Sequence, residues 1–112
     1  MLKLPEEVSE KYNTTSLKTV IHAAAPCPIE VKKQMIDWWG PILHEYYAGT
    51  EGNGFTYINS EDWLSHQGSV GKSLLGELVI DDDEANEIPV AEEGNVYFGR
   101  KIYVSFYQIN KK

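Results

Sequence analysis

The sequence predicts an α/β fold: a βαβ portion of a mostly parallel sheet, followed by a small antiparallel β subdomain. Two apolar segments, residues 17–26 and 42–48, flank a stretch with helical periodicity. The second half holds short alternating segments separated by glycines and acidic residues. At 112 residues the chain has the length of a single domain. Within it we expect a βαβ piece at 1–54, the small β subdomain at 55–98, and a separate tail at 99–112.

The first half of the chain is expected to form a strand, a helix and a second strand. The segment "LKTVIHAAAP" (17–26) is apolar enough for a strand buried on both faces, and Pro26 ends it. In "PIEVKKQMIDWWGP" (28–41) apolar residues recur at helical spacing, Pro28 suits the first turn, and Gly40 suits the end. The segment "ILHEYYA" (42–48) is rich in β-forming residues and ends at Gly49.

This order makes a right-handed βαβ unit with two parallel strands, whose carboxyl ends lie at one edge of the sheet. Ligands of open α/β sheets bind beyond those ends. We therefore expect "AAAPCP" (23–28) and "YYAGTEG" (46–52) to face one site together.

The second half predicts short β segments. "GFTYINS" (54–60) alternates like a strand, Ser60 opens a possible capped turn, and "GELVI" and "GNVYFG" are two further strands. The acidic run between those two strands is expected to be a solvated hairpin loop.

Composition excludes several classes of protein. With 10 basic and 17 acidic residues, and no basic cluster, the chain has no electrostatic footprint for nucleic acid. No apolar run approaches the roughly 20 residues that span a bilayer, and "MLKLPEEVSEKY" does not resemble a signal peptide. The single cysteine suits a reducing compartment, so we expect a cytoplasmic location.

The turn after residue 46 holds residue types that suit a nucleotide. Adjacent strand residues face opposite ways, so one of Tyr46 and Tyr47 can enter the core while a planar base stacks on the other. Small Ala48 and Gly49 allow close approach to the backbone. Thr50 offers a hydroxyl and an N–H to a phosphate, and Glu51 offers an oxygen ligand to Mg²⁺. An ordinary turn with a solvated acid is the simpler interpretation of Thr-Glu alone.

Other candidate motifs are weaker. "GSVGKS" (68–73) ends like a phosphate-binding P-loop, but His66 stands where the motif needs its first glycine. The histidines (His22, His44 and His66) lack the spacing of a transition-metal site. Cys27 is expected to be a small turn residue and not a nucleophile.

Three segments resemble one family in the right order. "YYAGTE" resembles the Tyr-Gly-x-Thr-Glu motif of the adenylate-forming superfamily, which includes acyl-CoA synthetases, luciferases and peptide-synthetase adenylation domains. Residues 17–41 resemble the upstream segment of the fatty acyl-CoA synthetase branch, and residues 63–98 resemble its downstream β subdomain. The resemblance spans Leu4 to Phe98 and implies an internal fragment of the large N-terminal AMP-binding domain.

The resemblance implies a ligase that activates a fatty acid or another carboxylic acid with ATP and Mg²⁺ and passes the acyl group to coenzyme A. It implies adenine stacking on Tyr47, a contact of Thr50 with the α-phosphate, and Mg²⁺ at Glu51. Thr50 and Glu51 are thus the candidate catalytic residues. The implied nucleotide-binding residues are Ala24, Ala25, Pro26, Tyr47, Ala48, Gly49 and Thr50. Ala48 and Gly49 would also border the carboxylate substrate.

The chain also departs from the family pattern. Ala48 stands where the motif has glycine, and the 112 residues contain no Ser/Thr/Gly-rich phosphate loop, no Thr-Gly-Asp and no lysine in the catalytic context. We therefore expect the chain alone to be inactive. It is either part of an acyl-CoA synthetase or a non-catalytic remnant that binds nucleotide. Uncovered strand edges and the three tryptophans favour a homo-oligomer or a strand-swapped dimer.

Overall fold

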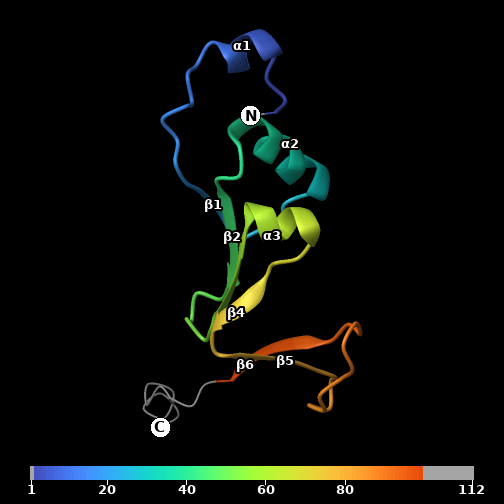
Figure 1. The fold of residues 1–112 in the computed structure, drawn as a ribbon. Coiled ribbons are helices and arrows are strands. Elements are labelled where there is room, and N and C mark those ends of the chain that lie inside the picture. The colour runs from blue at the N-terminus through green and yellow to red at the C-terminus, as the bar shows by residue number, and fades with distance from the viewer. Residues whose placement is uncertain (1, 100–112) are drawn as a thin grey trace. The chain divides into compact units, whose positions relative to one another are not determined.

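The computed structural model of the chain describes residues 2–99, which contain helices and strands in mixed order (Figure 1). The elements are α1 (Glu6–Glu10), β1 (Val20–His22), α2 (Ile29–Trp39), β2 (Leu43–Ala48), β3 (Phe55–Asn59), α3 (Ser60–Ser65), β4 (Lys72–Leu75), β5 (Glu77–Asp81) and β6 (Asn95–Gly99). They belong to two compact units. One comprises residues 2–48 and 56–72, and the other comprises residues 49–55 and 73–99.

The predicted βαβ unit is confirmed. Strands β1 and β2 pair in parallel, with Val20 opposite Leu43 and His22 opposite Glu45. Between them α2 begins after Pro28 and ends at Gly40, whose φ of 85° is open to glycine but strained for other residues. The helix therefore starts and stops where the proline and glycine signals predict.

The sheet itself is mixed, which corrects the expectation of a mostly parallel one. Its strand order is β1-β2-β3-β4, and β1 and β2, at one end of that order, pair in parallel. The direction of β3 follows from the short connection after β2, because a few residues can reverse a chain but cannot make a parallel crossover. Strand β4 was not predicted, since "KSLL" alternates over too few residues to stand out.

The core of the first unit lies on one face of these strands. Helices α2 and α3 lie on the same side of β1 and β2 in Figure 1, and four buried side chains form the cluster between helices and sheet. These are Ile36, Leu43, Ile58 and Trp63. Ile21, in contrast, is 67% exposed, so the prediction of a first strand buried on both faces is wrong.

Helix α3 begins with a side-chain cap and a buried serine. The Asn59 carboxamide oxygen accepts a hydrogen bond from the Asp62 N–H at 2.8 Å, so the cap is Asn59 and not Ser60 as expected. Ser60 is instead buried against β2. Trp63 is 2% exposed, so this tryptophan is in the core and does not provide an uncovered face for the expected oligomer.

The segment that resembles a P-loop leads into a strand. Lys72 and Ser73 begin β4, whereas the lysine and serine of a P-loop begin a helix. Gly71, with φ of 87°, lies against the Tyr57 carbonyl, and the Thr56 hydroxyl donates to the Val70 carbonyl oxygen at 2.7 Å. The segment therefore connects α3 to β4, and its contacts are with β3.

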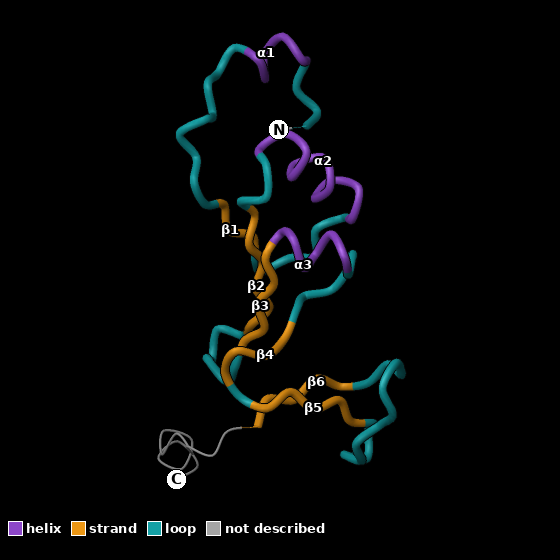
Figure 2. Tube along the Cα trace, viewed as in Figure 1, coloured by secondary structure: helices purple, strands orange, loops and turns teal. Residues whose placement is uncertain are grey.

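The second unit contains the predicted antiparallel hairpin. Strands β5 and β6 pair from Glu77 opposite Gly99 to Asp81 opposite Asn95, and the acidic loop joins them (Figure 2). The Asp82 carboxylate orders the start of this loop, because its Oδ1 accepts hydrogen bonds from the N–H groups of Glu84 and Asn86 at 2.8 and 2.9 Å. The predicted tail beyond Gly99 lies outside the described residues.

Candidate nucleotide-binding site

The parallel register places the two candidate segments beyond the same end of the β1–β2 pair. The last rung of the ladder joins His22 to Glu45, and β2 continues through Ala48 after β1 has ended. The segment 23–26 therefore leaves the sheet beside the last residues of β2. Parallel strands and a short turn into α2 produce this placement, as the sequence predicts.

The turn that follows β1 is exposed and has an unusual backbone. Ala24, Ala25 and Pro26 are all exposed. Ala24 has φ of 73°, a left-handed conformation that few residues other than glycine adopt. The turn thus presents small side chains and backbone, with no large side chain of its own to block a planar ligand.

The two adjacent tyrosines at the end of β2 are both largely accessible. Tyr46 is 43% exposed and Tyr47 is 45% exposed, so neither phenol is part of the core, contrary to the expectation for one of them. Strand alternation puts Tyr47 on the same face of β2 as buried Leu43 and Glu45. That face is the one covered by the helices, and Tyr46 lies on the other.

The next residues form a tight turn that belongs to the second unit. The Gly52 N–H donates to the Gly49 carbonyl oxygen at 3.1 Å, and Thr50 and Glu51 occupy the exposed centre of the turn. The Glu51 carboxylate folds back over Gly49, because a Cβ added at Gly49 would lie 2.7 Å from Glu51 Oε2. The Glu51 carboxylate can occupy this position because Gly49 has no side chain.

These residues fit a nucleotide and a hard cation in kind. An accessible phenol can stack on a base, and the turn offers the Thr50 hydroxyl and one exposed carboxylate. Magnesium needs only one or two carboxylates when phosphate oxygens complete its shell. Within residues 2–99 no three His, Cys, Asp or Glu side chains are grouped to hold a metal without such a ligand.

A buried ion pair, which no sequence motif indicates, lies on the same face of β2. Lys32 of α2 and Glu45 of β2 are 1% and 8% exposed and form a salt bridge. The Lys32 ammonium also lies 4.7 Å from the centre of the Trp63 ring. Lys32 precedes buried Ile36 by four residues and Glu45 follows buried Leu43 by two, so the spacing carried a signal that their charge obscured.

The thiol of Cys27 lies close enough to interact electrostatically with Glu45 and Lys32. Burial raises the pKa of Cys27 above its ordinary value, and the negative charge of Glu45 raises it further, while Lys32 acts in the opposite direction. Cys27 is thus held as a neutral thiol, which agrees with its predicted role as a turn residue.

The opposite face of the sheet carries a polar contact. His44 Nδ1 lies 2.5 Å from the Tyr57 hydroxyl, and the two rings stack with centroids 5.8 Å apart. This contact joins β2 to β3 on the face opposite to the helices.

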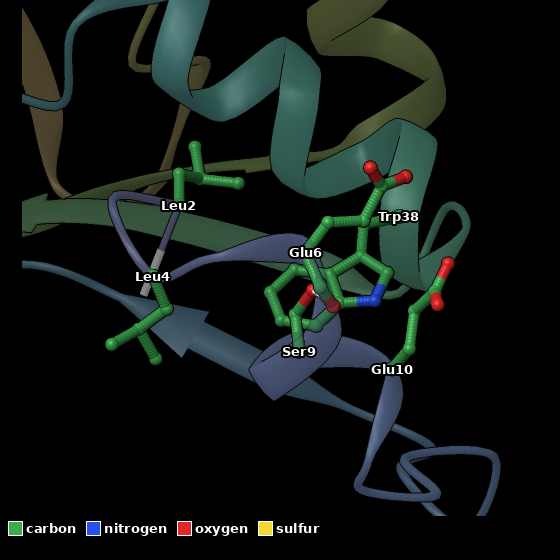
Figure 3. Close-up of a pocket in the computed structure, with 6 residues that line it drawn as sticks. All are labelled: Leu2, Leu4, Glu6, Ser9, Glu10 and Trp38. Carbon is green, nitrogen blue, oxygen red and sulfur yellow. Dashed lines mark hydrogen bonds between the residues drawn. The ribbon is translucent and has the colours of Figure 1, made fainter.

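A separate hollow of about 300 Å³ lies near the N-terminus (Figure 3). Its lining consists of Leu2, Leu4, Glu6, Ser9, Glu10 and Trp38. Figure 3 shows these side chains grouped around α1 and the end of α2. None of the candidate nucleotide-binding residues lines it.

Comparison with known families agrees with this geometry. The family model for AMP-binding enzymes matches residues 1–107, nearly the whole chain. The chain therefore belongs to the AMP-binding enzyme family. Membership implies use of ATP or AMP together with a carboxylate substrate, in the adenylate-forming superfamily that the three motifs resemble. No helix in residues 2–99 is long and apolar enough to cross a membrane.

Proposed function

We propose that the chain supplies the base-binding and phosphate-binding part of an acyl-CoA synthetase of the fatty acyl branch. The observation that supports this most is the parallel β1–β2 pair, whose carboxyl ends lead into the exposed Ala24–Pro26 turn and the accessible Tyr47 ring. The match to the AMP-binding family supports the nucleotide class. The acyl-CoA branch rests on the resemblance of the flanking segments.

Each residue has a separate proposed task. The Tyr47 ring stacks on adenine, with Ala24, Ala25 and Pro26 as the opposite wall. Ala48 and Gly49 leave room for the ligand to approach the backbone. ATP, when bound, supplies the adenylyl group to the carboxylate and releases pyrophosphate. The Thr50 hydroxyl and N–H are proposed to hold the α-phosphate in place.

Glu51 is proposed as a Mg²⁺ ligand through its carboxylate. Its position over Gly49 supports this role, because the exposed carboxylate folds back over the turn beside Thr50. Coenzyme A is the proposed acyl acceptor, and a homo-oligomer or strand-swapped dimer remains a prediction.

The 112 residues alone are proposed to bind nucleotide without forming an acyl-adenylate. One preorganised donor to a developing charge is worth about 100- to 1,000-fold in rate, and this chain has neither the phosphate loop nor the lysine of the family pattern. Adenylate formation by the purified chain, measured as pyrophosphate exchange with a panel of carboxylic acids, would contradict this part of the proposal. The alternative, a non-catalytic nucleotide-binding module, predicts the same nucleotide binding. It also predicts no acyl-adenylate formation when a second protein that carries a phosphate loop and a catalytic lysine is added.

Calorimetric titration with ATP and Mg²⁺ tests the site, with Tyr47→Ala as the variant and Tyr46→Ala as its control. The two phenols are adjacent and equally exposed but lie on opposite faces of β2. Base stacking on an aromatic ring is worth about 1–3 kcal/mol, so Tyr47→Ala should weaken binding about 5- to 150-fold. Equal losses in both variants, or no binding by a folded wild-type chain, would reject the proposal.

Gly49→Ala tests the metal ligand separately. An added methyl group at Gly49 would displace the Glu51 carboxylate while the exposed turn absorbs the change. We expect the affinity for ATP measured with Mg²⁺ to fall further than the affinity for AMP measured without Mg²⁺, because AMP binding loses only the room that Gly49 leaves for the ligand. Glu51→Gln should reproduce that difference.

A further inference from the structure

The buried pair formed by Lys32 and Glu45 joins three elements of the first unit. Lys32 lies on α2, Glu45 on β2, and the Trp63 ring of α3 lies over the ammonium group. Both charged side chains are almost fully removed from solvent. Lateral or axial movement of β2 against the helices would therefore separate two buried charges.

The pair also lies at the last rung of the parallel ladder. Glu45 is opposite His22, the final residue of β1, and beyond this rung β2 continues without that neighbour. Tyr47 follows Glu45 by two residues on the same face of the strand. The Tyr47 backbone thus lies two residues beyond the last rung, which contains one member of the ion pair.

The turn on the other side of the proposed base pocket is near the same charges. Cys27 directly follows Pro26, and its pKa responds to Glu45 and to Lys32 after the larger effect of burial. Lys32 itself follows in the first turns of α2, where its N–H donates to the Pro28 carbonyl oxygen at 3.0 Å. Both proposed walls of the pocket therefore connect through a few residues to one ion pair.

Stability alone does not account for such a pair. Removing two charges from water costs free energy that their attraction offsets only in good geometry, and well-packed apolar replacements of a buried pair are often neutral or stabilising. A charge-assisted hydrogen bond differs from an apolar contact in having a defined direction and length. Its distinctive contribution is therefore geometric.

We propose that Lys32 and Glu45 are positioning residues, which fix the carboxyl end of β2 and so hold the Tyr47 ring at a set height above the Ala24–Pro26 turn. The part of this inference that concerns nucleotide affinity rests on the proposed function. The part that concerns the end of β2 does not.

The main test replaces the pair by apolar residues of similar size, in the double variant Lys32→Met/Glu45→Leu. The matched control is Lys33→Met/Asp37→Leu, which makes the same charge change at two exposed positions of α2. Urea unfolding, amide hydrogen exchange at residues 46–48, and titration with AMP are measured on each protein.

We expect the double variant to keep a urea midpoint near that of the wild type, while residues 46–48 exchange about tenfold faster and AMP binds about tenfold more weakly. The control should leave all three measurements unchanged. Exchange and affinity like those of the wild type, in a double variant of native stability, would overturn the inference.

Two further outcomes remain decisive. If the wild-type chain binds no AMP, the proposed function fails, and the exchange rates at residues 46–48 still decide whether the pair fixes the end of β2. If the double variant does not fold, the variant Lys32→Arg is used in its place. Arginine keeps the positive charge, but its longer side chain changes the geometry of the salt bridge with Glu45. Exchange at residues 46–48 faster than in the wild type by about threefold or more would support the inference, and unchanged exchange would overturn it.

Discussion

The Ser60 hydroxyl forms two hydrogen bonds with the backbone of Leu43. It donates to the Leu43 carbonyl oxygen at 2.7 Å and accepts from the Leu43 N–H at 3.0 Å. Ser60 is the first residue of α3 and Leu43 the first of β2, so one buried hydroxyl fixes the helix against the strand.

Ser60→Ala should destabilise the protein by about 1–3 kcal/mol, because it leaves the Leu43 N–H and carbonyl buried without their partner. Ser65→Ala, at the exposed end of the same helix, should change the free energy of unfolding by less than about 0.5 kcal/mol. Urea denaturation of both variants measures the difference. Equal midpoints would show that the two bonds do not contribute to stability.

Gly71→Ala should prevent folding or destabilise the protein by roughly 3 kcal/mol or more. A methyl group there would overlap the Tyr57 carbonyl group, and φ of 87° adds backbone strain. Gly52→Ala is the control, since φ is 68° but no atom lies within 4 Å of the added carbon. It should cost only about 1–2 kcal/mol in thermal or urea unfolding. Similar losses at both glycines would mean that strain and not overlap decides the cost.

Cys27 should react with iodoacetamide more slowly than an exposed cysteine. Burial first, and then the charge of Glu45, raise the pKa of Cys27, so less thiolate is present at a given alkaline pH. The folded state thus favours the protonated thiol, and this contribution to stability is lost as pH rises through the folded pKa. The rate of alkylation between pH 7 and 10 measures the pKa. The same midpoint in the native protein and in urea would contradict this prediction.

The loop after β5 should keep its structure to lower pH than an ordinary aspartate would allow. The backbone N–H of Asn86, followed by its side-chain amide, holds the pKa of Asp82 below its usual value. The stabilising effect is therefore present above the unfolded pKa and is lost as pH falls through the lower, folded pKa. Amide chemical shifts of Glu84 and Asn86 followed by NMR report the titration. Asp82→Asn, which cannot ionise, should abolish it.

Local signals in the sequence account for much of the first unit. Pro28 and Gly40 bound α2, and β2 is the run of β-forming residues that stops before Gly49, because both features depend on backbone preferences of a few residues. The β5–β6 hairpin of the second unit was predictable for the same reason, since the acidic loop separates two short strand-like segments.

Features that depend on tertiary contacts were not predictable. Lys32 is charged and Ser60 is polar, yet both are buried because partners distant in sequence satisfy them. The mixed sheet was not predictable either, because it depends on the pairing of β3 with β2 and β4, which are tertiary contacts. Within the candidate site, the segment order predicts the common edge of β1 and β2, whereas the exposure of both tyrosines depends on how the helices cover the sheet.

The shortness of β1 has a practical consequence for work with the purified chain. Within the described residues, β1 is an edge strand of its sheet. It is three residues long and carries Ile21, whose side chain is 67% exposed. So short an edge strand offers few unpaired backbone groups to a strand of another molecule, so the exposed Ile21 side chain is the main point at which copies would associate. Ile21→Lys would oppose such association without touching Leu43 or Ile58, and would be the simplest route to samples that remain dispersed for NMR.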